Sequence, residues 1–448
     1  MSLTAGRDKR TVSVDDGEEM KIVIINKSDR TGGAAVVSFR LMQAMREAGV
    51  DARMLVVEKL TDSPYVEVAA TPPAIRIPFL WERLKIFVAN GFDRGSLFKI
   101  DTASDGLPLW NHPLVRGADA ILLNWVNQGM LSLDGVGKIL ALGKPVAWTM
   151  HDMWCMTGVC HHAGRCRGFE RDCQVCPLLG RHVLGKNLAK RIWKEKKRLY
   201  NMGEGIRFVA VSHWLKEKGE MSSLLGDQSV SVIPNAFIAG ERVKRGGRLP
   251  GDKVRIGFGA ARLDDPVKGF PVLVGMTRYI ASAYPELASR LELITFGGIK
   301  NAGLLDEIAL PHRHLGMVRG EMAIRKVYEN TDIIVSSSSY ETLPGTLVEA
   351  QAYDCIPVSF NQGGQRDIID HLSTGYIAAY SEDPEEAARE LGEGVVWAMR
   401  QIEDPESCVK IREMMRASVE RRFSPAKVVG DYLELLGLNP TSDASSED

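Results

Sequence analysis

Continuous apolar runs alternate with segments of helical periodicity along most of the chain. Residues 21–25 (KIVII) form one such run, and after a Gly-Gly turn Val37, Leu41 and Ala44 recur at helical spacing. This order predicts a strand, a loop and a helix. Further two-sided apolar runs predict strands in ARMLVV, AILLNWV, PVAWTM and RFVAVS. Because helical or loop segments separate these runs, we expect a parallel sheet that helices cover on both faces.

The pattern starts again in the second half of the chain. Around residues 231–253 the composition shifts to proline, glycine and charged residues, which predicts a hinge. The runs beyond it predict strands in VRIGFGAARLDD, RLELITFGG, HRHLGMV, TDIIVSSSS and CIPVSFN. They alternate with helical segments at 321–330 and 346–353. The second half is therefore expected to be another doubly wound α/β domain.

The same pattern sets the expected domain boundaries. After a Ser-Pro start, Val428, Val429 and Tyr432 share one helical face, which predicts a docked terminal helix. The predicted ranges are 1–20 for a flexible N-terminus, 21–240 for the first Rossmann-like domain, 250–410 for the second, 411–438 for terminal helices and 439–448 for a disordered tail. A cysteine-rich insertion at 155–177 interrupts the first domain.

Bulk composition narrows the function classes. The chain has 448 residues, 45% of them hydrophobic, which is enough for two domains that each bury a core. Lys and Arg number 56 against 57 Asp and Glu, so we expect no nucleic-acid partner. No apolar stretch is long enough to cross a bilayer, and the N-terminal residues lack the apolar region of a secretory signal. We therefore expect a cytoplasmic protein.

Two glutamates flank a turn in the stretch YETLPGTLVEA. Glu341 follows an expected strand, at the sheet edge where open α/β domains bind ligands. Pro344 and Gly345 then turn the backbone into a helix that begins near Thr346, whose free amides and dipole favour a phosphate. Glu349 falls within the first turn of that helix, where it could accept hydrogen bonds from ribose hydroxyls. A phosphate site between two hydroxyl acceptors suits a sugar nucleotide, although such a pair also arises as a helix-terminus acid and an exposed loop acid.

Two cations follow the first strand of the second domain. Arg262 and Lys268 could neutralise a diphosphate, the first as a planar fork and the second as a point charge. Alone, they would suit a solvated basic loop that Asp264 and Asp265 partly neutralise. Their combination with the two glutamates favours a ligand site.

These stretches together resemble the retaining GT-B glycosyltransferases of the family 4 type, which are related to glycogen and sucrose synthases. The resemblance covers nearly the whole chain, from TGG in the first loop through IPN at the hinge, RLDDPVKG, ETLPGTLVE and GGQRDII to the closing helix. It implies two facing Rossmann-like domains with a cleft between them. The N-terminal domain would take the acceptor and the C-terminal one the donor nucleotide, and the last helix would cross back to the N-terminal domain.

The resemblance also implies roles for single residues. Arg262 and Lys268 would hold the donor diphosphate, Glu349 the ribose, and Glu341 the transferred sugar, which His151 would face from the first domain. The implied catalytic residues are His151, Glu341, Arg262 and Lys268, and the implied donor-binding residues are Gly32, Gly33, Arg262, Lys268, Glu341, Leu343, Pro344, Gly345, Thr346 and Glu349. One departure is Asp354, near a position where relatives have glycine; it affects the expected shape of the pocket floor.

The activity implied by the resemblance is retaining transfer of a hexosyl-type sugar from a nucleotide-diphosphate sugar to a glycan or lipid-linked acceptor, in polysaccharide or glycoconjugate synthesis. No metal cofactor is expected for catalysis. Two alternatives remain open, a GT-B sugar-nucleotide epimerase and a catalytically silent sugar-nucleotide-binding scaffold. A dehydrogenase fits less well because DRTGGAA lacks the spaced glycines of a dinucleotide fingerprint.

The insertion contains four cysteines with the spacing C-x5-C-x6-C-x2-C, namely Cys160, Cys166, Cys173 and Cys176. Four thiolates suffice for tetrahedral zinc, and the closing Cys-x2-Cys is typical of zinc sites, but the first pair is wider than usual. A structural zinc, unligated packing cysteines, and disulfides or another metal all remain open.

The segment 181–198 that follows is rich in Lys and Arg and contains a single Glu. Leu188, Ile192 and Trp193 give it partial amphipathicity. It predicts either a solvated helix or a peripheral contact with anionic lipid at the inner face of the membrane.

Overall fold

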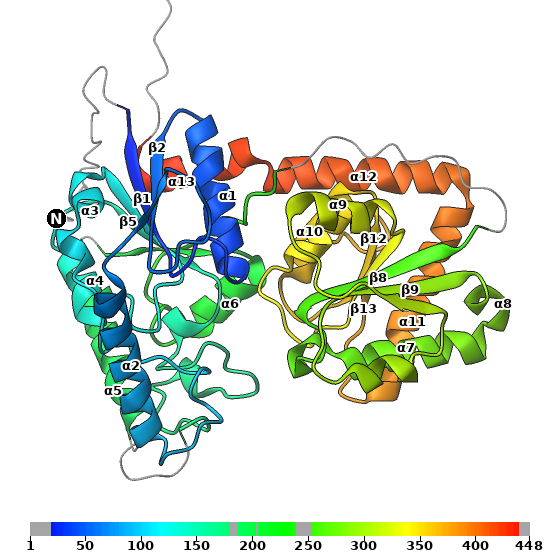
Figure 1. Cartoon of the computed structure of the whole chain (residues 1–448), viewed down its shortest axis with the longest axis horizontal. Coiled ribbons are helices and arrows are strands. Elements are labelled where there is room, and N and C mark those ends of the chain that lie inside the picture. Colours follow the sequence, from blue (N-terminus) through cyan, green and yellow to red (C-terminus); the bar gives the residue numbers. More distant parts are fainter. Residues whose placement is uncertain (1–18, 180–186, 203–204, 239–251, 439–448) are drawn as a thin grey trace, which may run out of the picture. The chain divides into compact units, whose positions relative to one another are not determined.

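The computed structural model describes residues 19–179, 187–202, 205–238 and 252–438. The chain divides into two compact units. Unit 1 comprises the chain up to Val211, then Leu215–Ala236, and finally the segment from Pro425 onward; unit 2 comprises Ser212–Trp214 and Phe237–Ser424. Each unit is described by itself below (Figure 1).

Unit 1 is built on a parallel sheet of seven strands. In chain order these are β1 Lys21–Ile25, β2 Asp51–Val56, β3 Val66–Val68, β4 Ala120–Leu123, β5 Val146–Met150, β6 Arg207–Ala210 and β7 Val230–Val232. Their order in the sheet is β3-β2-β1-β4-β5-β6-β7, and every adjacent pair is parallel. The central strands β4 and β5 are buried along their whole length, in agreement with their largely apolar sequences.

Helices connect and cover these strands. They are α1 Gly33–Glu47, α2 Pro72–Ala89, α3 Pro113–Gly117, α4 Leu133–Leu140, α5 Leu188–Tyr200, α6 His213–Met221 and α13 Pro425–Leu436. The last of these comes from the far end of the chain. Val428, Val429 and Leu436 of α13 are buried in the same core cluster as Ile22 and Met45. The hydroxyls of Thr149 and Tyr432 lie 2.8 Å apart and join β5 to α13.

Unit 2 repeats the architecture on a parallel sheet of six strands. These are β8 Val254–Arg262, β9 Leu291–Gly298, β10 His312–His314, β11 Ile333–Ser336, β12 Ile356–Phe360 and β13 Tyr376–Ala378, in the order β10-β9-β8-β11-β12-β13. Its helices are α7 Phe270–Ala283, α8 Pro285–Ala288, α9 Glu321–Glu329, α10 Gly345–Ala352, α11 Pro384–Glu403 and α12 Pro405–Phe423. Apolar side chains of β8, β9, β11 and β12 form the core together with α7 and α11.

The predicted fold class is therefore confirmed: the protein is an α/β chain with two Rossmann-like parallel-sheet domains. The strands expected from apolar runs are present, and the helices expected at 321–330 and 346–353 correspond to α9 and α10.

Some of the expected features fall outside the described residues. These are nearly all of the N-terminal segment 1–20, the tail 439–448, much of the hinge around 239–251, and the first part, 181–186, of the basic segment. Within the described ranges, no helix combines the length and apolar character that a bilayer span needs.

Candidate functional site

The carboxyl ends of two neighbouring strands define the candidate site in unit 2. Strands β8 and β11 are adjacent and parallel, with Ile256 opposite Ile333. Their carboxyl ends therefore meet at one edge of the sheet, which is where open α/β domains bind ligands. Arg262 is the last residue of β8, and the loop to Lys268 follows it directly.

A close backbone contact holds this loop against the loop that follows β11. Gly269 has φ +67°, and a Cβ there would lie 2.1 Å from the carbonyl oxygen of Ser337. The Ser337 hydroxyl donates to the carbonyl oxygens of Lys268 and Gly269 at 2.8 and 3.0 Å. Only glycine fits this contact, because any side chain would separate the two loops. The contact fixes the position of Lys268 relative to the loop that carries Glu341.

Lys268 and Glu341 form an ion pair at this edge. The Lys268 ammonium contacts Glu341 Oε1, and the hydroxyl of Ser338 donates to the same oxygen at 3.0 Å. The two charged side chains remain 30% and 20% exposed. The pair is thus accessible to a solute while Ser338 restrains the carboxylate.

A double-glycine loop packs against the backbone on the other side of Glu341. The Gly364 amide donates to the Glu341 carbonyl at 3.0 Å. A Cβ on Gly363 would come within 1.9 Å of that carbonyl oxygen, and one on Gly364 within 2.0 Å of the Thr342 carbonyl oxygen. The GGQRDII stretch therefore needs its glycines so that the two backbones can lie in contact.

Helix α10 begins four residues after Glu341, at Gly345. Its N-cap residue is Pro344, whose side chain accepts no hydrogen bond, so the amides at the start of the helix have no partner in the N-cap side chain. Leu343 and Pro344 are buried, whereas Gly345 is exposed and Thr346 is half-buried. Of the four predicted donor-binding residues in this turn, Leu343 and Pro344 thus shape the turn, while Gly345 and Thr346 are accessible to solvent.

Glu349 lies on the first turns of α10 and has a partner within unit 2. The hydroxyl of Tyr328 donates to Glu349 Oε2 at 2.8 Å. Tyr328 is fully buried and stacks on Tyr353, with ring centroids 5.4 Å apart. This packing orients the carboxylate of Glu349, which remains partly exposed.

Arg262 lies close to the acids that follow it. Its guanidinium is 3.4 Å from both Asp264 Oδ1 and Asp265 Oδ2, and its side chain is 42% exposed. These distances are longer than a well-formed charged hydrogen bond. The loop aspartates therefore neutralise part of the charge of Arg262, as a solvated basic loop would require. The side chain is also accessible, as a ligand site would require.

The departure at Asp354 does not change the backbone turn. Asp354 has φ +63°, in the left-handed region that favours glycine, where a short polar side chain is also tolerated. The amides of Asp354 and Cys355 donate to the carbonyls of Gln351 and Ala350, which closes α10 with the usual glycine-type ending. Arg416 of α12 donates to the Asp354 carboxylate at 2.6 Å. An ion pair to α12 therefore accompanies the missing glycine.

The predicted residues of unit 1 lie at the carboxyl ends of β1 and β5. Gly32 caps α1 with φ +91°, a conformation that requires glycine, and a Cβ on Gly32 or Gly33 would meet open space. His151 lines a small pocket with Ser38, Asn124, Asn235 and Tyr432. The loop between β1 and α1 is thus open to a solute, and His151 faces a recess of unit 1 that polar and apolar residues line together.

His151 is held as a neutral ring. Its Nε2 donates to Asn124 Oδ1 across 2.8 Å. Burial lowers the pKa of His151 to about 4, although the charge of Asp152 opposes the shift. At neutral pH the ring can donate one hydrogen bond and accept another, but it carries no charge.

The cysteine cluster does not fit a zinc site. Throughout the described ranges, which include all four cysteines, no group of three or more His, Cys, Asp or Glu side chains could hold a metal ion. Cys160, Cys166, Cys173 and Cys176 are free thiols, so the disulfide alternative is not realised either. Burial raises the pKa of Cys160 to about 12 and also raises the pKa values of Cys173 and Cys176. The structure thus agrees with unligated packing cysteines, and the expectation of zinc has no structural support.

Sequence reasoning missed some residues of these sites. Ser338 and Asn124 restrain Glu341 and His151, yet neither was given a role. Asn124 directly follows the buried strand β4, and Ser338 lies two residues after the buried strand β11. A polar residue at that point of a parallel strand is the signal that could have found them.

Comparison with known proteins places this fold among the GT-B glycosyltransferases. A crystal structure of a glycosyltransferase from Rickettsia africae ESF-5 superposes with a TM-score of 0.59 and 14% identity, over 94% of this chain and 98% of that one. HepE from Anabaena, solved in complex with UDP, superposes with a TM-score of 0.55 and 15% identity, over 93% and 99% of the two chains. At such identities the likeness concerns the fold.

Sequence comparison adds two findings. Residues 290–407 match the family described as Glycosyl transferases group 1, and this range contains Glu341 and Glu349. A curated relative is WcaC of Escherichia coli K12, which has the provisional name of a colanic acid biosynthesis glycosyl transferase. It is 24% identical over 231 residues, which are 49% of this chain and 55% of that protein. The matched region thus spans about half the length of this relative.

Proposed function

We propose that this protein is a retaining glycosyltransferase that moves a hexosyl-type sugar from a nucleotide-diphosphate sugar to a glycan or lipid-linked acceptor. The observation that carries the proposal is the accessible Lys268–Glu341 ion pair beside the amino end of α10, at the carboxyl edge of the unit 2 sheet. The family match over residues 290–407 supports the transfer of a sugar. The description of WcaC supports a role in polysaccharide synthesis.

The ion pair suits a ligand that carries both a diphosphate and hydroxyls. A partly exposed pair contributes only about 0–1 kcal/mol, so a ligand can replace it at little cost. Lys268 would then contact a diphosphate oxygen together with Arg262, and Glu341 would accept hydrogen bonds from the sugar hydroxyls. The amides of Gly345 and Thr346 would add a phosphate site at a helix N-terminus. Glu349, oriented by Tyr328, would accept from the ribose.

In the proposed reaction these groups stabilise the leaving diphosphate. The bond between the anomeric carbon and the phosphate oxygen breaks as the acceptor oxygen bonds to the same carbon from the same face. Negative charge develops on the departing oxygen, where preorganised cations and amides lower the barrier. The acceptor proton passes to that oxygen, so the products are a glycoside and a nucleoside diphosphate. This route uses no protein nucleophile and no catalytic divalent metal.

Two measurements on the full chain test the proposal. The first is thermal unfolding with UDP, GDP, ADP and their sugar conjugates, because a ligand at about 100 times its Kd stabilises the folded state by about 2.7 kcal/mol. UDP is the first nucleotide to try, since HepE was solved with it. We expect one nucleoside diphosphate to raise Tm in the wild type and in Lys410→Ala, an exposed control on α12, but much less in Lys268→Ala.

The second measurement follows the fate of the donor without an acceptor. Slow release of the nucleoside diphosphate, with the sugar freed by water, is expected for a transferase. An isomerised donor would instead indicate an epimerase, and a bound but unchanged donor would indicate a binding scaffold. If no nucleotide raises Tm at millimolar concentration, the proposed site is wrong.

A further inference from the structure

Helix α2 of unit 1 differs from an ordinary surface helix, because it buries two charged residues beside Ile86 and Ala89 and exposes large apolar side chains. A helix at the surface usually turns its apolar stripe to the core and its charges to water. In α2 the charged residues Glu82 and Arg83 are 0% and 6% exposed. Large apolar residues of the same helix lie at the surface instead.

The inward face of α2 is fixed by a network of charged and polar contacts. Glu82 Oε1 accepts hydrogen bonds from the amides of Thr102 and Ala103 at 2.9 and 2.7 Å. The Arg83 guanidinium pairs with Asp101 and donates to the carbonyl of Leu97. These bonds tie the segment after α2 to one side of the helix, and they determine which side faces inward.

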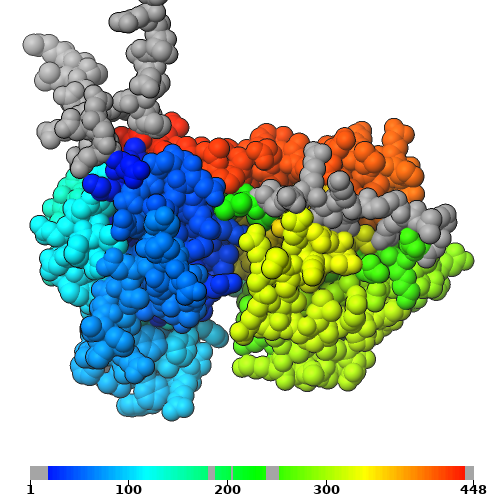
Figure 2. Space-filling view, turned by 45° about the horizontal axis from the view of Figure 1, so that its top comes forward, coloured from blue at the N-terminus to red at the C-terminus, as the bar shows by residue number. Residues whose placement is uncertain are grey.

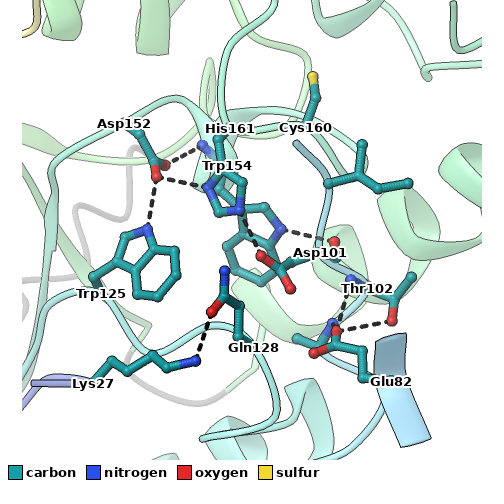
Figure 3. Close-up of polar contacts among 12 residues, drawn as sticks. Lys27, Glu82, Asp101, Thr102, Trp125, Gln128, Asp152, Trp154, Cys160 and His161 are labelled. Atoms are coloured by element: carbon teal, nitrogen blue, oxygen red, sulfur yellow. Dashed lines mark hydrogen bonds and ion pairs between the residues drawn. The ribbon is translucent and has the colours of Figure 1, made fainter. Parts of the chain in front are cut away.

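The network continues to the insertion, as Figure 3 shows. His161 lies between two carboxylates, with Nε2 2.6 Å from Asp101 Oδ2 and Nδ1 2.7 Å from Asp152 Oδ2. Asp152 also accepts from the Trp125 indole at 2.9 Å. Several partners on separate segments thus hold the inner face of α2, so the helix cannot turn its apolar side inward without breaking them.

The outward face of α2 is an apolar stripe. Ile77, Leu80, Trp81 and Leu84 are 68%, 60%, 54% and 47% exposed. Their spacing of i, i+3, i+4 and i+7 places them on one side of the helix. Phe92, 63% exposed, continues this stripe beyond the end of α2, where its ring packs on Phe87. Figure 2 shows this mid-blue part of the chain at the surface of unit 1.

Cations border the stripe. Arg76 lies one turn before Leu80, and Lys85 lies one turn after Trp81, so each edge of the stripe has one positive charge. The exposed residues Arg94 and Lys99 add charge near Phe92 and Phe98. Two acids lie in the same region: Asp105 pairs with Lys85 at 2.7 Å, and Asp93 is exposed. The four cations against these two acids leave the border positive.

The basic helix α5 lacks such a stripe. Its larger apolar residues Leu188, Ile192 and Leu199 are buried, and so is Lys196, which donates to the carbonyl of Trp154 at 2.6 Å. Its neighbours Lys190 and Lys197 pair with aspartates. The described part of 181–198 therefore offers polar side chains to solvent and no large apolar surface that could enter a lipid layer.

We propose that the outward face of α2, together with Phe92, docks unit 1 on an anionic lipid surface. A helix of this kind lies in the membrane plane, with its apolar side chains at the level of the acyl boundary and its cations among the headgroups. Trp81 suits the interfacial region because an indole has an apolar body and one polar N–H. Charge complementarity selects anionic lipid, since the border of the stripe is positive. This contact is independent of the proposed sugar transfer.

The test is sedimentation of the full chain with vesicles. One set contains phosphatidylcholine only, and the other contains about one third phosphatidylglycerol, at low and at high salt. We expect the wild type to bind the anionic vesicles at low salt and to bind less at high salt. The double substitution Ile77→Ser with Trp81→Ser should lower the partition coefficient at least about tenfold, because it removes two large apolar groups from the stripe.

Two matched variants complete the design. Val409→Ser with Met322→Ser removes two exposed apolar side chains of unit 2, and Arg191→Ser with Lys194→Ser neutralises exposed cations of α5; both should bind like the wild type. Because every substituted residue is exposed, the Tm of each variant should stay near the wild-type value. If Ile77→Ser with Trp81→Ser lowers the Tm, the double substitution Leu80→Ser with Leu84→Ser is tested in its place. The proposal is wrong if the wild type does not bind anionic vesicles or binds both vesicle types equally. It is also wrong if the α2 variant binds as well as the wild type, or if the α5 variant loses vesicle binding. Self-association through α2 without vesicle binding would overturn it as well.

Discussion

Each unit contains a cluster of charged residues in direct contact, but the two clusters differ in their access to water. In unit 2, Lys268 and Glu341 are 30% and 20% exposed. In unit 1, Arg83, Asp101 and His161 are almost completely buried and every one of them bonds to several partners. The first cluster lies at a sheet edge that a ligand can reach, whereas the second joins α2 to the segments around it.

The difference shows how exposure determines what an ion pair can do. A partly exposed pair is nearly neutral for stability, so its members can exchange partners when a ligand binds. A buried pair is different, because removing one member leaves the other as an uncompensated charge out of water. Ion pairs with similar short contacts can thus be part of a binding site or part of the architecture.

The largest expected effect is in the buried cluster. Arg83→Met would leave Glu82 without its cation and Asp101 with His161 as its only charged partner in the cluster, and it should lower the free energy of unfolding by about 3–5 kcal/mol. Denaturation in urea measures it. Arg83→Lys keeps the charge and should lose less.

The matched control is Arg278→Met on α7. Arg278 pairs with Glu307, and the two side chains are 59% and 50% exposed. We expect a change below about 1 kcal/mol. If Arg83→Met and Arg278→Met cost the same, the distinction between the two clusters is wrong.

A second prediction concerns pH. Burial alone would lower the pKa of His161, but Asp152 and Asp101 outweigh it and raise that pKa to about 10. The contribution of the imidazolium to stability is therefore fully present below the unfolded pKa of about 6.5 and is lost as pH rises toward 10. His161→Gln should remove a slope of up to about 1.4 kcal/mol per pH unit between about pH 7 and 10. Urea denaturation across this range, with His312→Gln as an exposed control, measures the difference from wild type; identical slopes would contradict it.

The smallest expected free-energy change, and the one specific to activity, is at the exposed pair. Lys268→Ala and Glu341→Ala should each cut turnover at least tenfold, about 1.4 kcal/mol or more, because each removes a contact that we propose to the donor. Their unfolding free energies should change by less than about 1 kcal/mol. Steady-state kinetics and urea denaturation of the same preparations separate the two effects. Full activity in both variants would refute the proposed roles.

Much of the candidate site in unit 2 could be predicted from the sequence. The apolar runs that form β8 and β11 put Arg262, Lys268 and Glu341 beyond two strand ends, and parallel strands bring such ends to one edge. The Pro344-Gly345 turn likewise predicts the start of α10. These features depend on short stretches of chain and on the general geometry of α/β sheets.

The buried cluster of unit 1 could not be predicted in this way. His161 and Asp101 are 60 positions apart, and neither lies in a regular strand or helix. The orientation of α2 could not be predicted either, because the apolar side of a helix is by itself expected to face the core. The side that faces inward is decided by the partners of Glu82 and Arg83, which are distant in the sequence.

Lys196 illustrates the limit within one helix. It lies in the segment 181–198, for which a solvated helix was one of the two predictions, but it is fully buried against the Trp154 ring. Burial lowers its pKa to about 7, although nearby thiols oppose the shift. Helical periodicity does place Lys196 on the same side as Ile192 and Leu199. The high positive charge of the segment favoured a solvated position for all its cations instead.

The return of α13 to the first core has a consequence for synthesis on the ribosome. Domains usually fold in the order in which they emerge, the N-terminal one first. Here the apolar side chains of Val428, Tyr432 and Leu436 that complete the first core are translated after all of unit 2. The nascent first domain therefore cannot complete its core until α13 is synthesised, and part of its interior stays accessible to chaperones until then. The second domain can fold before that point.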